Sequence, residues 1–172
     1  DKFILGGGSN ILFTKNISGL VIHNQIKGIN ILKDNECFLE IEVGAGEAWD
    51  DFVSWSTKND FYGAENLSLI PGSVGAAPIQ NIGAYGVELK DIFIKLEAVN
   101  LSTKEIKIFN KSACEFSYRD SIFKNQLKNE FIITKVYFKL YKNRKINTSY
   151  KVLKMEIEKL IIRRSEDLKV NF

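Results

Sequence analysis

The segment "IPGSVGAAPIQNIGAYG", from Ile70 to Gly86, constrains the fold of this chain more than any other stretch. It holds both prolines, four of the 12 glycines and no charged side chain. Glycines permit positive φ and close backbone approach, whereas prolines stiffen the run. A long loop inside a compact domain is uncommon unless it is functional. Two interpretations stay open: a loop against which a flat ligand lies, or a buried crossover packed by small residues.

A second glycine run, "ILGGGSN", follows a short predicted strand and ends in Ser9 and Asn10. Consecutive glycines let backbone N–H groups converge, which suits phosphate oxygens. The run matches neither a GxGxxG helix start nor a Walker loop, and taken alone it is more typical of a tight connection. Together, the two uncharged glycine loops indicate a nucleotide-like cofactor gripped mainly by backbone.

The third feature is "EFSYRDSIF", in which Arg119 lies between Tyr118 and Asp120. An arginine fork matches a carboxylate or a phosphate and stabilises charge that develops in a reaction. The alternative is a structural ion pair between Arg119 and Asp120 on a surface turn.

Composition excludes several classes of function. The 172 residues carry a formal net charge of only +3, too small an excess to favour nucleic acid as a partner. One histidine and two cysteines without CxxC spacing predict no metal site. No apolar run approaches the roughly 20 residues of a membrane span, and no signal peptide is visible. The chain begins without methionine, so we expect a fragment or an N-terminally incomplete domain.

Periodicity predicts an α+β fold. The shorter predicted strands are "KFIL", "LVIH" and "IKGINIL". Three longer strands should each bury one face: Leu39, Ile41 and Val43; Ile94, Leu96 and Ala98; Ile132, Thr134, Val136, Phe138 and Leu140.

Two helices are predicted. One follows Gly46 and buries Trp49, Phe52 and Val53. The other runs from Ser149 to about Arg164, with an apolar stripe of Leu153, Ile157, Leu160 and Ile161. Composition becomes basic and polar near Lys142, which indicates a linker or the start of another lobe.

Four blocks carry a resemblance to a known family: "LGGGSN", "GAGEAWDDFV", "ENLSLIPGSVGAAPIQNIGAYGVE" and "YRDSIFK". Their order and spacing resemble the UDP-N-acetylmuramate dehydrogenases, also called UDP-N-acetylenolpyruvoylglucosamine reductases. The resemblance covers about Lys2 to Leu140. It implies an FAD-binding fold like that of vanillyl-alcohol-oxidase-type flavoproteins, with two lobes around FAD. Residues 1–141 would form the FAD-binding domain, and residues 142–172 a linker and a truncated remnant of the substrate-binding domain.

The resemblance also implies which residues bind FAD. The first glycine loop would hold the pyrophosphate, the segment from Ile70 to Gly86 would lie against the flavin, and one strand residue would add a weaker contact. The residues are Gly6, Gly7, Gly8, Ser9, Asn10, Pro71, Gly72, Gly75, Ala76, Ile79, Asn81, Gly83, Ala84, Tyr85 and Ile133.

The reaction implied is the NADPH-dependent reduction of UDP-N-acetylenolpyruvoylglucosamine to UDP-N-acetylmuramate, in peptidoglycan precursor synthesis in the bacterial cytoplasm. Arg119 matches the catalytic arginine, and Tyr118 and Tyr150 match substrate-binding positions. Neither a nucleic acid nor a membrane is implied as a partner, and the oligomeric state is not indicated.

The chain also departs from the family. Ala76 stands where relatives often have serine, and no segment matches the Gly-Asn-Ala-Gly-Ser-like loop of the serine proton donor or the late catalytic glutamate. The chain alone should therefore not turn over. An alternative is a non-catalytic flavin- or nucleotide-binding module derived from this family. A different oxidoreductase on the same fold is disfavoured by "YRDSIF" and by the position of the lone His23 outside both cofactor loops.

Overall fold

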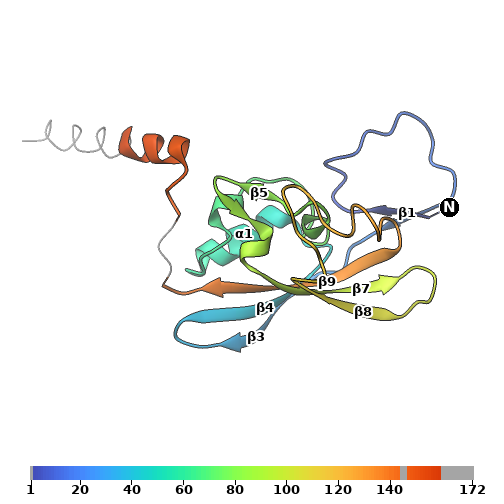
Figure 1. Ribbon diagram of the computed structural model, residues 1–172, viewed down its shortest axis with the longest axis horizontal. Helices are drawn as coiled ribbons and strands as arrows, with labels where there is room; N and C mark the ends of the chain where they lie inside the picture. Colours follow the sequence, from blue (N-terminus) through green and yellow to red (C-terminus); the bar gives the residue numbers. More distant parts are fainter. Residues whose placement is uncertain (1, 144–146, 160–172) are drawn as a thin grey trace, which may run out of the picture.

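The computed structural model describes residues 2–143 and 147–159, and three small sheets organise it (Figure 1). A parallel pair joins β1 (Lys2–Leu5) to β2 (Leu20–His23). A short antiparallel hairpin joins β5 (Gly83–Ala84) to β6 (Val87–Glu88). The largest sheet has the order β3-β4-β9-β7-β8 and is antiparallel throughout, with strands β3 (Ile29–Asp34), β4 (Phe38–Gly44), β7 (Phe93–Asn100), β8 (Ile106–Asn110) and β9 (Phe131–Tyr141).

Helix α1 (Trp49–Lys58) packs on one face of the five-stranded sheet. Trp49, Phe52 and Val53 are buried, as predicted. The ring of Phe52 stacks on that of Phe138 at 4.9 Å between centroids, and the Trp49 indole N–H donates to the Leu67 carbonyl at 2.8 Å. This aromatic contact anchors α1 to the central strand β9, so the loops on either side of the helix have a rigid base.

The buried faces of the strands follow the prediction except where a bulge changes the phase. Leu39, Ile41 and Val43 of β4 are fully buried. On β9 the prediction was wrong at its start, because Ile133 is buried and Ile132 and Thr134 are not. The buried residues that match the prediction are Val136, Phe138, Leu140, Leu96 and Ala98.

A register shift explains the change on β9. Glu97 pairs with Lys135, yet the next residue of β7, Ala98, pairs with Ile133. One residue of β9 is thus extra, and a bulge of this kind moves every earlier side chain to the opposite face. A second irregularity at the start of β7 buries Phe93 and leaves the neighbouring Ile94 half-buried.

The second predicted helix is present from residue 151 to residue 159, where Leu153 and Ile157 are half-buried. The remainder of that prediction, including Leu160 and Ile161, lies outside the described residues. Short 3-10 helices complete the chain: η1 (Glu65–Leu67), η2 (Ala77–Gln80) and η3 (Leu89–Asp91). No helix in the described part of the chain combines the length and hydropathy of a membrane span.

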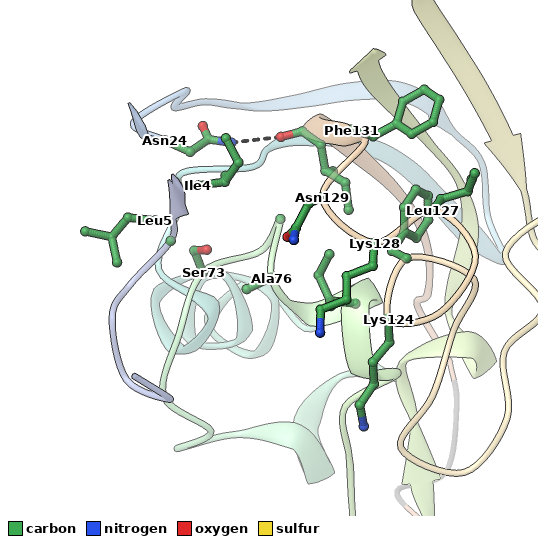
Figure 2. Close-up of a pocket in the computed structure, with 15 residues that line it drawn as sticks. Ile4, Leu5, Asn24, Ser73, Ala76, Lys124, Leu127, Lys128, Asn129 and Phe131 are labelled. Atoms are coloured by element: carbon green, nitrogen blue, oxygen red, sulfur yellow. Dashed lines mark hydrogen bonds between the residues drawn. The ribbon is translucent and has the colours of Figure 1, made fainter. Parts of the chain in front are cut away.

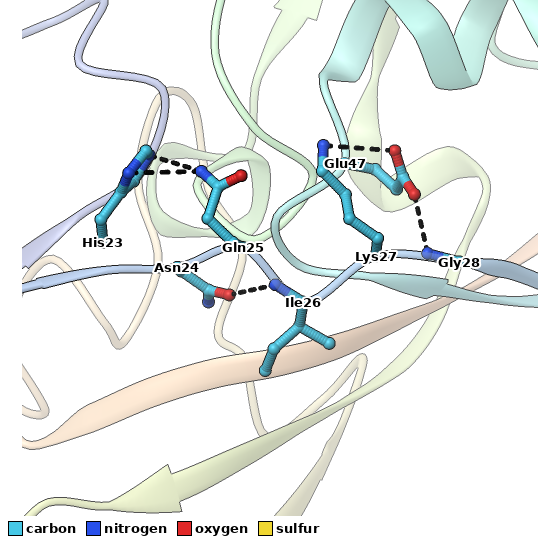
Figure 3. A network of polar contacts seen from close by, with 7 residues as sticks. All are labelled: His23, Asn24, Gln25, Ile26, Lys27, Gly28 and Glu47. Carbon is cyan, nitrogen blue, oxygen red and sulfur yellow. Dashed lines mark hydrogen bonds and ion pairs between the residues drawn. The ribbon is translucent and has the colours of Figure 1, made fainter.

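The segment between β2 and β3 joins the small parallel sheet to the main sheet, and Figure 3 shows its contacts. The Glu47 carboxylate accepts the Gly28 N–H at 2.7 Å and lies 3.5 Å from the Lys27 ammonium. A Cβ on Gly46 would lie 2.6 Å from the backbone of Gln25. The segment "GAGEAW" therefore contains glycines at 44 and 46 because two chain segments pass each other here without room for side chains.

Candidate cofactor site

The two glycine loops that the sequence singled out lie against each other. A Cβ on Gly6 would come 2.8 Å from the Ser73 hydroxyl oxygen, and one on Gly7 would come 3.1 Å from the Gly72 Cα. Gly72 has φ +128°, a conformation that side chains of L-residues rarely adopt. The first glycine loop, from the β1–β2 lobe, and the second, from the α1 lobe, thus form one continuous backbone surface.

Two adjoining cavities, each of about 270 Å³, lie along this surface. The first lies between β1 and the loop that precedes β9, as Figure 2 shows, and the second lies beside α1. Four residues line both cavities and form their common wall: Ser73, Ala76, Ile79 and Lys124.

The cavity walls are mainly apolar side chains and glycine backbone. Only Lys124 and Lys128 contribute charge among the residues that line either cavity, and both come from the loop before β9. Such walls suit a ligand with flat apolar groups at its ends and negative charge between them. FAD has this form, and a side chain on Gly6 or Gly7 would fill the space between the loops. The residues present therefore fit FAD.

Nine of the predicted FAD-binding residues line these cavities. Those on the first cavity are Gly6, Gly75, Ala76, Ile79 and Ile133. Those on the second are Ser9, Asn10, Pro71, Gly72, Ala76 and Ile79. Gly7 and Gly8 lie in the same loop without lining either cavity.

Asn81 lines neither cavity, and its contact with FAD stays a prediction. Its side chain is fully buried, its Nδ2 donates to the Ser117 carbonyl at 2.9 Å, and its Oδ1 accepts the Lys90 N–H at 3.1 Å. The backbone of Asn81 is left-handed, with φ 43°. The amide thus fastens the second glycine loop to the loop that carries Arg119 instead of lining a cavity.

The arginine loop is tied to the second glycine loop at two further points. Arg119 itself is left-handed, with φ 54°, and Tyr118 is 84% exposed. The alternative interpretation was an ion pair between Arg119 and Asp120, and no such pair forms among the described residues. The Asp120 carboxylate accepts a hydrogen bond from the Asn125 amide instead, at 2.8 Å. The two bonds run from Arg119 Nη2 to the Gly83 carbonyl at 2.7 Å and from the Ser121 hydroxyl to the Ile79 carbonyl at 2.7 Å.

Tyr85, at the far end of the second loop, meets Tyr150, which follows β9 in the chain. The rings of Tyr85 and Tyr150 lie edge to face, with centroids 5.6 Å apart. Asn66 donates through Nδ2 to the carbonyls of both Tyr85 and Asn147, at 3.1 and 2.9 Å. The structure therefore groups Gly83, Ala84 and Tyr85 with the arginine and tyrosine region beyond the two cavities.

Sequence reasoning missed several wall residues. Ser73 and Lys124 line both cavities, and each stands inside one of the four blocks that carry the family resemblance. Their positions carried a signal: a hydroxyl amid glycines, and a lysine closely following an arginine turn. Lys128, Leu127 and Asn129 gave none, because they reach the cavity only through the path of the loop before β9. No group of three or more His, Cys, Asp or Glu side chains within residues 2–143 and 147–159 is placed to hold a metal ion.

The fold and the site together define a flavin-dinucleotide-binding protein. The family model described as "FAD binding domain" matches residues 2–108, and the chain belongs to this family. Its cofactor is FAD.

The curated relatives point to one kind of enzyme. The chain is 55% identical over 159 residues to a UDP-N-acetylenolpyruvoylglucosamine reductase of Flavobacterium johnsoniae, covering 92% of this chain and 47% of that protein. It is 54% identical over 149 residues to the protein of the same name from Amoebophilus asiaticus, covering 87% of this chain and 44% of the relative. The chain thus spans a little under half the length of these relatives.

Solved structures confirm the predicted fold class. A crystal structure of UDP-N-acetylenolpyruvylglucosamine reductase from Thermus caldophilus matches with a TM-score of 0.65 at 22% identity, over 92% of this chain and 55% of that one. Cholesterol oxidase from Brevibacterium sterolicum matches with a TM-score of 0.54 at 15% identity, over 81% of this chain and 30% of that one. At such identities the likeness shows the fold alone, which is the α+β fold of vanillyl-alcohol-oxidase-type flavoproteins.

Proposed function

We propose that the full-length protein reduces UDP-N-acetylenolpyruvoylglucosamine to UDP-N-acetylmuramate with NADPH, as a cytoplasmic step of bacterial peptidoglycan synthesis. Cell wall biogenesis, cell shape and cell division would then depend on it. The names of the relatives support this activity. Because the chain spans under half of those relatives, the activity is assigned to the protein of full length.

The observation that carries the proposal is the bond between Arg119 and Gly83. The guanidinium donates to the last part of the glycine loop at 2.7 Å, so a fixed positive charge stands beside the proposed flavin loop. A guanidinium has five N–H donors. This bond uses one of them and leaves the others for a substrate carboxylate.

When bound, FAD would supply the redox chemistry by relaying a hydride from NADPH to the enolpyruvyl double bond, and a proton donor of the full-length protein would complete the reduction. Arg119 stabilises the negative charge that grows on the neighbouring carboxylate, which is where a preorganised donor lowers a barrier most. Tyr118 and Tyr150 are proposed to contact the substrate, since one is exposed beside Arg119 and the other packs on Tyr85.

The proposed FAD contacts fall into two groups. The cavity-lining residues and the adjacent Gly7 and Gly8 hold the cofactor by backbone and shape. Gly83, Ala84 and Tyr85 are proposed to border the flavin near Arg119, and Asn81 supports them from behind. We also propose that the FAD-binding domain ends at residue 141, where β9 ends.

The experiment that tests this function is R119A in the full-length protein, with R119K as the matched charge-retaining control. We expect R119A to retain FAD and to be reduced by NADPH, while reoxidation by the enolpyruvyl substrate slows by about 10²–10³-fold, as for other lost oxyanion donors. The observable is the return of flavin absorbance in stopped flow. Reoxidation of R119A at the wild-type rate would contradict the catalytic role proposed for Arg119. A wild-type protein that binds FAD without reacting would favour the non-catalytic module.

A further inference from the structure

We propose that Lys124 binds the phosphates of the cofactor and, through the Arg119 carbonyl, fixes the turn that carries the arginine. The first part concerns FAD alone. The second part rests on the proposed function, because it concerns how Arg119 serves the reaction.

The position of Lys124 is the first support. It belongs to the common wall of the two cavities, whereas Lys128 lines only the first. FAD is a single molecule whose diphosphate lies between its flavin and adenine ends. A ligand that extends from one cavity to the other must therefore carry its diphosphate past their common wall. There Lys124 shares the first cavity with Gly6 and the second with Ser9 and Asn10 of the first glycine loop.

Charge is the second support. No acidic side chain lines either cavity among the residues that the structure describes. The Lys124 ammonium is thus not neutralised within the walls and favours a dianion. Hydrogen bonds between an ammonium and a phosphate are charge-assisted and roughly twice as strong as neutral ones.

The third support is the bond between Lys124 Nζ and the Arg119 carbonyl, at 2.9 Å. Arg119 has a left-handed backbone, and the two bonds that close its turn, between Ser117 and Asp120, are long at 3.2 and 3.3 Å. The turn is therefore weakly held by its own hydrogen bonds, and the bond from Lys124 adds to its stability. An ammonium has three donors, so Lys124 can hold the carbonyl with one and a phosphate with the others. Binding of the cofactor would then restrain the lysine and, with it, the arginine turn.

The first experiment measures FAD affinity of the full-length protein by flavin fluorescence, at low and high salt. The variants are K124M, the charge-retaining K124R, and K128M as a control lysine from the same loop. Because K124M loses a charge-assisted hydrogen bond, we expect its Kd for FAD at low salt to rise by about tenfold or more. Its affinity should also fall less with salt, because screening acts on the charge that was removed. K124R should keep the wild-type salt dependence, and K128M should lose less affinity than K124M.

Equal affinity and equal salt dependence in K124M and wild type would overturn the phosphate contact. An equal loss of FAD affinity in K128M would also overturn it, because the effect would then come from the overall positive charge of the loop and not from a contact of Lys124. Because Lys124 is exposed, circular dichroism should show a folded K124M. Should K124M fail this check, K124Q and the K124R salt series replace it.

The second experiment measures turnover at saturating FAD. If Lys124 fixes the arginine turn, K124M lowers kcat for the enolpyruvyl substrate about tenfold with FAD fully bound, and K124R restores most of it. Unchanged kcat would overturn the positioning role. A wild-type protein that fails to bind FAD, or that binds it and leaves the substrate unreduced, contradicts the proposed function itself. If wild type binds FAD and reduces the substrate, and K124M matches it in both FAD affinity and kcat, only the role of Lys124 is contradicted.

Discussion

Gly7 and Gly72 approach so closely that a Cβ on Gly7 would lie 3.1 Å from the Cα of Gly72. The contact joins the lobe of the parallel sheet to the lobe of α1 at the cofactor site. Gly7 lacks a side chain because the loops meet backbone to backbone, whereas Gly72 is glycine because its φ of +128° strains any other residue.

The G7A variant should separate cofactor binding from folding. The added methyl meets backbone that cannot rotate away, so the loops part, and we expect FAD affinity to fall about tenfold, the equivalent of 1.4 kcal/mol. Fluorescence titration with FAD measures the effect. The matched control is G28A, because a Cβ on Gly28 meets no atom within 4 Å. Its positive φ should cost stability and leave FAD affinity unchanged; equal losses of affinity in both variants would contradict the prediction.

Asn81 should be a stability residue. The N81A variant removes the donor to the Ser117 carbonyl and the acceptor of the Lys90 N–H. We expect the free energy of unfolding to fall by about 2–4 kcal/mol in urea titrations, because each lost hydrogen bond contributes about 0.5–1.5 kcal/mol and alanine adds about 1 kcal/mol in the left-handed backbone.

The N81G variant isolates the backbone contribution. Glycine tolerates the φ of 43° and lacks the same hydrogen bonds, so it should lose about 1 kcal/mol less than N81A. If N81A and N81G were equally stable, the left-handed backbone would contribute nothing to the loss of stability in N81A.

The two cysteines should differ in reactivity. Burial raises the pKa of the Cys114 thiol to about 12, whereas Cys37 is exposed. The thiolate is the reactive form, so one equivalent of a thiol reagent should react with the folded protein at pH 8 and two after unfolding. In C37S no thiol should react before unfolding. Rapid labelling of folded C37S would mean that Cys114 is accessible.

Glu42 should make stability depend on pH in the acid range. Burial alone would raise its pKa, but hydrogen bonds from Tyr137, Lys135 and Asn30 outweigh this and hold the pKa below the ordinary 4.5. A lowered pKa in the folded state means that the carboxylate stabilises the fold fully above pH 4.5, and that this contribution is lost as pH falls through the folded-state pKa.

The E42Q variant tests the acid dependence. It should be about 1–2 kcal/mol less stable than wild type at pH 7, because a hydrogen bond to a charged group contributes about 1.5–3 kcal/mol and one between neutral groups only about 0.5–1.5 kcal/mol. The difference should shrink as the pH falls below 4.5. Urea titrations at several pH values measure it, with E40Q on the same strand as the control. A difference that stays constant between pH 7 and pH 3 would assign the loss to shape instead of charge.

Much of this molecule could be predicted from local sequence. Alternation fixed the buried faces of β4 and of most of β9, and the 3.6-residue period placed Trp49, Phe52 and Val53 on the inner side of α1. Glycines identified both cofactor loops, because a positive φ or a close backbone approach excludes other residues. These features depend only on residue types and on their spacing along the chain, so they can be read from the sequence.

Tertiary structure decided the rest. The bulge opposite Glu97 reversed the start of β9 and buried Ile133 in place of Ile132, because register belongs to a pair of strands. Asn81 proved to fasten the arginine loop, and Lys124 proved to lie between two cavities. Such roles arise where segments far apart in the chain meet, and the side-chain sequence of one segment carries no record of which carbonyl or cavity the fold brings to it.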